Sequence, residues 1–125
     1  MYKVIVTKVY LSQAKKTLSP TERETARNVF RDVLRRNPLT FGDPISFKFF
    51  REFRIEGKRI FYLVYKDYTI VLVVGTSKKK NQQKIINSIK VKLPKFKIFA
   101  QQIKIFNFSF QSRRFIPCFK GISIS

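Results

Sequence analysis

The sequence predicts an α+β domain in which a helical hairpin packs on one face of a mostly antiparallel sheet. Three observations predict this fold class. A capping box opens a strong amphipathic helix at Ser19. The spacing of apolar residues then changes from helical to alternating after residues 41–44, and short turn signals separate the alternating segments. We expect the order β-α-α-β-β-β, with a small C-terminal helix after the last strand.

The first two elements follow from short apolar patterns. Residues 2–7 form a short segment rich in apolar, β-branched side chains, which is typical of a strand. Residues 9–18 place their apolar side chains near helical spacing, so we expect a first helix there.

The second helix has the strongest local signal in the chain. Ser19 is an N-cap residue, Pro20 suits the first helical position, and Glu22 completes the capping box. Residues 37–38, Asn-Pro, end the helix. Because so short a break separates the two helices, we expect them to form an antiparallel hairpin.

Three strands follow. Residues 47–55 alternate apolar and polar side chains, and residues 56–57, Glu-Gly, suit a two-residue hairpin turn. Residues 58–66 are almost continuously apolar, as in the centre of a sheet. Residues 68–75 form the last strong strand pattern, and isoleucines within 85–89 predict the small helix.

The charge of the chain is large and uneven. The 125 residues include 27 Lys and Arg against 7 Asp and Glu, a net charge of +20. Residues 68–125 contain 12 basic and no acidic residue. Since 44% of the residues are hydrophobic, the chain has enough apolar side chains for a core. The charge therefore indicates a surface for a polyanion or for an acidic partner.

The composition also excludes several kinds of site. With no His and a single Cys, the chain has no zinc or iron–sulfur site, no disulfide framework and no His-dependent catalytic site. We expect no metal and no small-molecule cofactor. No apolar run approaches the roughly 18 residues of a membrane span, and the N-terminus lacks a signal-peptide pattern. We therefore expect a cytoplasmic protein that does not use a membrane.

The last part of the chain has a different composition. Residues 91–125 are rich in Lys, Ile and Phe and contain no acidic residue. Alternation in residues 95–98 and 103–110 favours an extra hairpin, which would extend the sheet or form a dimer contact. The alternative is a tail that does not belong to the domain. We therefore divide the chain into a domain over 1–90 and a basic extension over 91–125.

Two motifs resemble one family of proteins. Residues 50–56 form an aromatic and basic strand that leads into Gly57-Lys58-Arg59-Ile60-Phe61-Tyr62. A hydrophobic strand then ends at Gly75 and is followed by three lysines. In this order the motifs resemble the RelE/ParE superfamily of toxins from toxin–antitoxin pairs. The resemblance covers residues 1 to about 90 and implies a RelE-like fold.

The resemblance implies a toxin that blocks translation by cutting messenger RNA on the ribosome. It also implies a metal-independent endoribonuclease and a cognate antitoxin that covers the basic cleft. The positions that match the family's catalytic pattern are Arg51, Arg54, Arg59 and Lys78. The positions expected to contact nucleic acid are Lys48, Lys58, Lys79, Lys80, Arg27 and Arg31.

The chain departs from the family pattern after its last strand. Thr76 and Ser77 stand where many members have His or Arg, and residues 81–83 stand where many ribonucleases of the family have an aromatic residue. A general base would have to be a neutral lysine, Glu52 or Glu56.

Other interpretations remain open. The strand arginines could be solvated residues that pair with Glu52 and Glu56, and the aromatic residues could all belong to the core. Alternatives to the ribonuclease toxin are a non-catalytic or gyrase-directed ParE-like relative and an unrelated small RNA-binding protein.

Overall fold

A mixed five-stranded sheet with the strand order β1-β5-β4-β3-β2 forms the centre of the molecule. The structure is a computed structural model, which describes the backbone of residues 1–109 and the side chains of residues 1–105. The strands are β1 (Lys3–Val6), β2 (Asp43–Pro44), β3 (Phe50–Ile55), β4 (Lys58–Tyr65) and β5 (Ile70–Ser77). β1 runs parallel to β5, and the other neighbours are antiparallel. The predicted α+β class with a mostly antiparallel sheet is confirmed.

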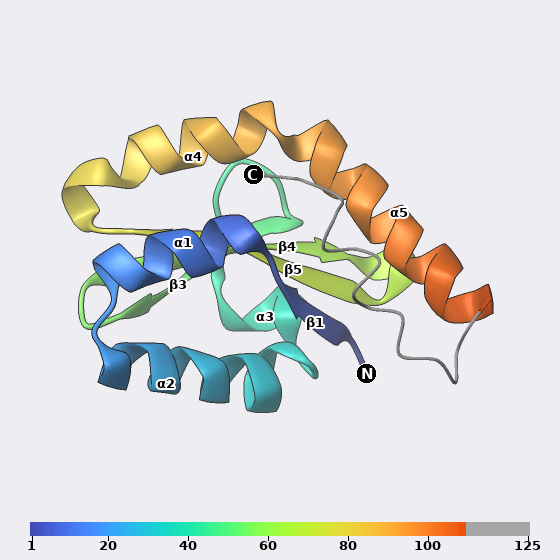
Figure 1. Ribbon diagram of the computed structural model, residues 1–125, viewed down its shortest axis with the longest axis horizontal. Helices are drawn as coiled ribbons and strands as arrows, with labels where there is room; N and C mark the ends of the chain where they lie inside the picture. Colours follow the sequence, from blue (N-terminus) through green and yellow to red (C-terminus); the bar gives the residue numbers. More distant parts are fainter. Residues whose placement is uncertain (110–125) are drawn as a thin grey trace.

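Helices cover both faces of this sheet. They are α1 (Lys8–Thr17), α2 (Pro20–Val29), α3 (Pro38–Phe41), α4 (Gln82–Val91) and α5 (Leu93–Ser109). A π-helical turn, η1 (Phe30–Leu34), prolongs α2, and short 3-10 turns η2 (Lys66–Tyr68) and η3 (Lys79–Asn81) flank β5. α4 and α5 lie along one side of the sheet and α2 lies on the other (Figure 1).

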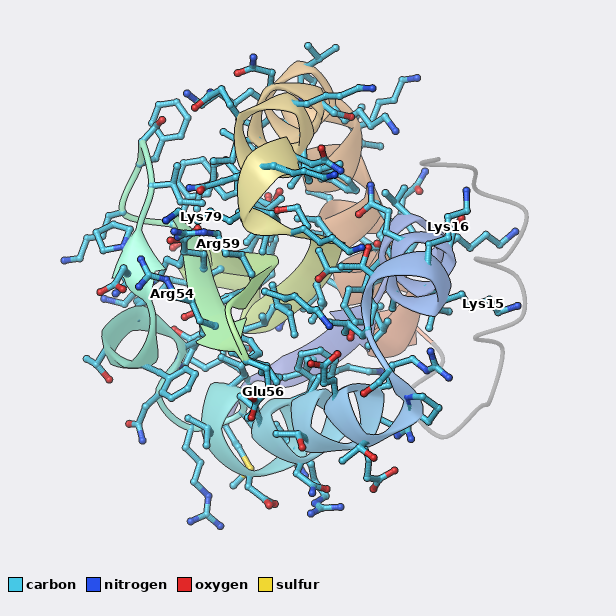
Figure 2. The ribbon with its side chains drawn as sticks, turned by 90° about the vertical axis from the view of Figure 1, so that its left-hand side faces the viewer. Lys15, Lys16, Arg54, Glu56, Arg59 and Lys79 are labelled. Atoms are coloured by element: carbon cyan, nitrogen blue, oxygen red, sulfur yellow. The ribbon has the colours of Figure 1, made fainter. Side chains whose placement is uncertain are left out.

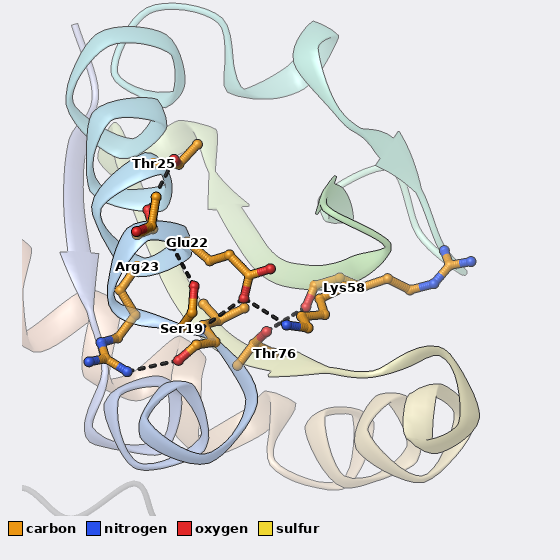
Figure 3. Close-up of polar contacts among 9 residues, drawn as sticks. Ser19, Glu22, Arg23, Thr25, Lys58 and Thr76 are labelled. Carbon is orange, nitrogen blue, oxygen red and sulfur yellow. Dashed lines mark hydrogen bonds and ion pairs between the residues drawn. The ribbon is translucent and has the colours of Figure 1, made fainter.

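The capping box predicted for the second helix is present. The Glu22 backbone N–H donates to Ser19 Oγ at 3.1 Å, and the Ser19 backbone N–H donates to Glu22 Oε1 at 2.8 Å (Figure 3). These bonds satisfy two backbone donors that the first turn of a helix leaves free. The predicted helical hairpin is also confirmed, because α1 ends at Thr17 and α2 begins after a short connection at Pro20.

Two cores lie on the two faces of the sheet. On one face, Tyr10 and Ala14 of α1 and Phe30 and Leu34 of η1 pack on the strands. On the other face, a second cluster of buried side chains comes from three segments. These are Phe50, Phe61, Leu63, Ile70, Leu72 and Val74 from the strands, Ile86 and Ile89 from α4, and Phe96, Phe99, Ala100 and Ile103 from α5. Because both faces are covered, β4 and β5 read as nearly continuous apolar runs.

Two boundaries differ from the sequence prediction. Residues 47–49 were expected in a strand, but the Phe50 backbone N–H donates to the Phe47 carbonyl at 3.1 Å, so the chain turns there and β3 begins at Phe50. The expected loop over residues 41–44 contains the short strand β2, which pairs with β3, and the helix α3 comes just before it and begins at Pro38. Proline suits this first helical position because the backbone N–H that it lacks has no helical partner there.

The extension forms a helix where alternation suggested strands. Within α5, Phe96, Ala100 and Ile103 are buried in the core at helical spacing. The hairpin expected from residues 95–98 and 103–110 is therefore wrong for the residues that the structure describes, and residues 110–125 of the extension lie outside them. A domain boundary near residue 90 stays a prediction. Over residues 1–109, no helix is long and apolar enough to cross a membrane.

Candidate nucleic-acid interface

The tight turn between β3 and β4 sets which arginines are neighbours. Glu56 and Gly57 both have positive φ angles, 50° and 79°, as a two-residue turn with the twist of the strands requires. The resulting register places Arg54 directly opposite Arg59. Opposite residues in an antiparallel pair point to the same face, so two guanidinium groups lie side by side at this end of the sheet.

A carboxylate lies between these two arginines. Glu52 precedes Arg54 by two residues and points to the same face. Its Oε2 atom is paired with Arg59 Nη1 and lies 4.0 Å from Arg54 Nη2. Like charges opposite each other destabilise a sheet, and the Glu52 carboxylate offsets this repulsion.

Ser77 completes the arrangement, because its Cα pairs with that of Arg59 on the other side of β4. We call Glu52, Arg54, Arg59 and Ser77 the Arg59 cluster. Glu52 Oε1, Arg59 Nε and Ser77 Oγ are buried and have no hydrogen-bond partner among the described residues. The cluster therefore offers unused hydrogen-bonding atoms of both kinds, donors and acceptors.

The side chains of the Arg59 cluster differ in their exposure to solvent. The Arg54 side chain is 59% exposed, whereas those of Arg59 and Glu52 are 13% and 9% exposed. Lys78, Lys79 and Lys80 follow β5 and are all exposed. Arg54, Arg59 and Lys79 lie on the side of the molecule opposite Lys15 and Lys16 (Figure 2). A polyanion on this side would meet Arg54 and the lysines first.

Arg51 lies on the opposite face of β3 and is only 5% exposed. Its Nη2 donates to the Gly42 carbonyl at 2.5 Å, and its Nη1 donates to the Lys48 carbonyl at 3.2 Å. Tyr62 joins the same network: its hydroxyl donates to the Pro38 carbonyl at 2.9 Å and accepts from the Gly42 N–H at 3.1 Å. Burial raises the pKa of the Tyr62 hydroxyl. Arg51 therefore holds the chain between α3 and β3 in place.

Lys58 is also separate from the Arg59 cluster. Its Nζ donates to Glu22 Oε1 at 2.7 Å, so it ties the start of β4 to the capping box of α2 (Figure 3). The hydrogen bond from Lys58, helped by the one from the Ser19 backbone N–H, lowers the pKa of the Glu22 carboxyl.

The remaining predicted contacts lie elsewhere. Arg27 pairs with Glu24 at 2.5 Å and Arg31 with Asp32 at 2.9 Å, both on exposed surface. Lys48 is exposed in the turn before β3. Of the ten predicted site residues, the structure thus gathers Arg54, Arg59 and the three lysines after β5 at one end of the sheet.

Sequence reasoning did not assign a role to Ser77. Its place beside Arg59 depends on an irregularity in the β4–β5 register at Phe61 and Tyr62, which residue types do not reveal. Over the described residues, no group of three His, Cys, Asp or Glu side chains is placed to hold a metal ion.

Comparison by sequence finds no relative: no family model and no curated protein matches the chain. Comparison by structure finds toxins. A chain of the toxin–antitoxin complex RelBE2 from Mycobacterium tuberculosis matches at 21% identity and a TM-score of 0.55, over 62% of this chain and 91% of that one. A chain of the intact E. coli RelBE complex matches at 20% identity and a TM-score of 0.54, over 62% of this chain and 96% of that one. A mutant of the E. coli toxin RelE in the free state matches at 17% identity and a TM-score of 0.57, over 70% of this chain and 97% of that one.

These similarities show that the chain has the fold of RelE toxins. They confirm, at the level of the fold, the resemblance that the sequence motifs indicated. Nearly the whole of each solved chain is matched, whereas 62–70% of this chain is. About a third of this chain therefore has no counterpart in these structures.

Proposed function

We propose that this protein is the toxin of a toxin–antitoxin pair and that it acts on messenger RNA at the ribosome. The observation that carries the proposal is the juxtaposition of Arg54 and Arg59 beside the lysines that follow β5, within a RelE-like fold. Fixed guanidinium groups bind phosphate in a bidentate manner, and the surrounding lysines add long-range attraction. Its partner is an antitoxin whose acidic surface covers this cluster.

The proposed reaction is cleavage within an RNA strand without a metal. The 2′-oxygen forms a bond to the adjacent phosphorus, and the bond from phosphorus to the 5′-oxygen breaks, which leaves a 2′,3′-cyclic phosphate and a 5′-hydroxyl. The 2′-hydroxyl loses its proton to a base, and the leaving 5′-oxygen gains one. Arg54 and Arg59 would stabilise the negative charge of the phosphorane. Glu52, whose Oε1 has no partner among the described residues, is the carboxylate nearest this charge.

A second candidate is a relative that binds without cutting. It is favoured by the pairing of Glu52 with Arg59, which leaves the cluster with less free positive charge than two isolated arginines would have. It is also favoured by the lack of His in the whole chain. In this case the same surface would hold RNA, or a protein such as gyrase, as a passive block.

The test is translation in a cell-free extract, with mapping of messenger RNA ends. The variant is Arg59→Gln combined with Glu52→Gln, so that neither charge is left buried alone. Arg36→Gln, at an exposed position two residues after the end of η1, controls for the removal of a single positive charge elsewhere on the surface. We expect the native protein to cut RNA in a translation-dependent manner and the double variant to cut about 100-fold more slowly.

Three outcomes separate the candidates. Inhibition with cleavage supports the ribonuclease toxin. Inhibition without new RNA ends supports the binding relative. The toxin proposal is refuted if the folded native protein does not inhibit translation and if no acidic protein encoded by an adjacent reading frame binds it.

A further inference from the structure

A row of four aromatic rings lies at the end of the sheet away from Arg59. The rings of Phe47 and Phe49 stack with centroids 5.4 Å apart and planes 13° apart. Those of Tyr65 and Tyr68 stack at 6.1 Å and 24°. Phe49 and Tyr65 join the two pairs at 6.4 Å. We call these four residues the aromatic row. The row is continuous, and Phe47 at one end of it is 43% exposed.

A cavity of about 450 Å³ lies against this row. Phe49, Tyr65 and Tyr68 form one side, and Leu93 and Pro94 from the first turn of α5 form another. Sites for small ligands commonly measure roughly 300–1,000 Å³, so the space suits a planar group of the size of a nucleobase. The walls are largely apolar, which favours stacking over solvation.

Two lysines and one aspartate line the cavity. Lys66 and Lys97 line it, both are exposed, and neither forms an ion pair with a described residue. Lys48, beside Phe47, is exposed as well. Asp67 is the acidic residue that lines the cavity, and its carboxylate can accept a hydrogen bond from the exocyclic amino group of a base.

The extension holds the row in position. Gln101 of α5 donates from Nε2 to the Tyr68 hydroxyl at 2.8 Å. Thr69, directly after Tyr68, has a positive φ of 52°, which fixes the turn into β5. The cavity therefore depends on α5, the helix that the strand prediction missed, and its rings are already arranged before a ligand arrives.

We propose that the aromatic row and its cavity bind an unpaired base of single-stranded RNA, with the flanking phosphates on Lys66 and Lys97. Stacked ring faces beside free lysines are the combination by which proteins hold single strands. The inference rests on the proposed function, since it supplies a second contact for the same RNA. Arg59 and Tyr65 are six residues apart on β4, about 20 Å at the rise of a strand, so the two contacts are separable by mutation.

The test measures binding of fluorescently labelled oligoadenylate by anisotropy, beside an oligomer of the same length whose sugars carry no bases. We expect Tyr68→Ala to weaken oligoadenylate binding about 10-fold and to leave the abasic oligomer unchanged. Tyr68→Phe keeps the ring but removes the hydroxyl that accepts the hydrogen bond from Gln101, so its loss of binding should be clearly smaller than that of Tyr68→Ala. Lys97→Ala should weaken both oligomers, whereas Lys104→Ala, the same change at an exposed position on α5, should weaken neither beyond its small effect on net charge.

A second readout avoids substitution altogether. The chain has no Trp and five Tyr, so its intrinsic emission comes from tyrosine. Oligoadenylate should quench this emission, and the abasic oligomer should not. Equal binding of both oligomers, or unchanged affinity in folded Tyr68→Ala, would overturn the inference. Quenching of the tyrosine emission by an acidic aromatic peptide, with no quenching by oligoadenylate, would assign the row to a protein partner instead.

The two proposals fail differently. If the aromatic row does not bind RNA, the native protein still inhibits translation and Tyr68→Ala inhibits it equally. If the proposed function is wrong, neither protein inhibits translation at any concentration.

Discussion

The two faces of the β3–β4 hairpin use their basic residues for different purposes. On one face, Arg51 and Lys58 are bonded to backbone carbonyls and to Glu22, and they join segments of the fold. On the other face, Arg54 and Arg59 share one carboxylate and lie beside exposed lysines. Four basic residues of one sequence motif thus divide by strand alternation into structural and accessible charges. A large net charge therefore does not describe one binding surface.

The largest effect that would break this comparison is expected at Arg51. Arg51→Ala removes the donors for the Gly42 and Lys48 carbonyls, and we expect it to lower the free energy of unfolding by about 2–4 kcal/mol. Urea unfolding at neutral pH measures the change. Arg54→Ala is the matched control on the same strand, and we expect it to change stability by less than about 0.5 kcal/mol. Equal losses in the two variants would contradict the division of the faces.

A smaller effect is expected within the Arg59 cluster. Arg59→Gln alone leaves the Glu52 carboxylate, which is 9% exposed, without its main partner, and we expect a loss of about 1–3 kcal/mol. Adding Glu52→Gln should recover most of this loss, because no unpaired charge remains. Thermal unfolding of the two variants and the native protein tests the coupling. If the second substitution recovers nothing, the pair does not explain the stability of this end of the sheet.

The capping box sharpens the structural side of the comparison. Ser19→Ala removes the acceptor for the Glu22 N–H, and we expect it to cost about 1 kcal/mol. Ser19→Gly should cost only a few tenths of a kcal/mol, because glycine is well tolerated at an N-cap. A larger loss for glycine than for alanine, measured by urea unfolding, would show that the cap does not explain the start of α2.

The smallest effect concerns acid stability through Lys58. The pKa of Glu22 is lowered from its ordinary value of 4.5 in the folded state, mainly by the hydrogen bond from Lys58. The ionised carboxylate therefore stabilises the fold above pH 4.5, and this contribution is lost as the pH falls below that value through the folded pKa. Lys58→Met should be less stable than the native protein at neutral pH, and the difference should shrink in acid. A difference that stays constant with pH would rule out this ion pair as the cause.

Much of the fold was predictable because its signals are local. The capping box at Ser19, the Glu56–Gly57 turn and the apolar run of β4 each state their structure within a few residues. The helix α5 was not, because Lys95 to Ile98 alternates over so short a run that strand and helix patterns overlap. What decides for the helix is burial of Phe96 and Ile103 on the sheet, a long-range contact.

The candidate site was predictable in its residue types and less so in its grouping. The turn at Glu56–Gly57 already implies that Arg54 faces Arg59 and that Arg51 faces Tyr62, so the alternation could have separated these arginines. The placement of Ser77 required the register of β4 and β5, which a bulge shifts. The bonds of Arg51 to carbonyls depend on the path of the chain before β3, and no side-chain pattern encodes that path.

The measurement that tests the central claim most directly is inhibition of cell-free translation by Arg54→Gln. This side chain is 59% exposed and lies 4.0 Å from its nearest carboxylate oxygen, so the substitution should leave the unfolding curve unchanged. If the accessible face acts on RNA, we expect about a 10-fold higher concentration of the variant for half-inhibition. If the folded Arg54→Gln variant inhibits translation at the same concentration as the native protein, the claim that this face of the hairpin performs the function is contradicted.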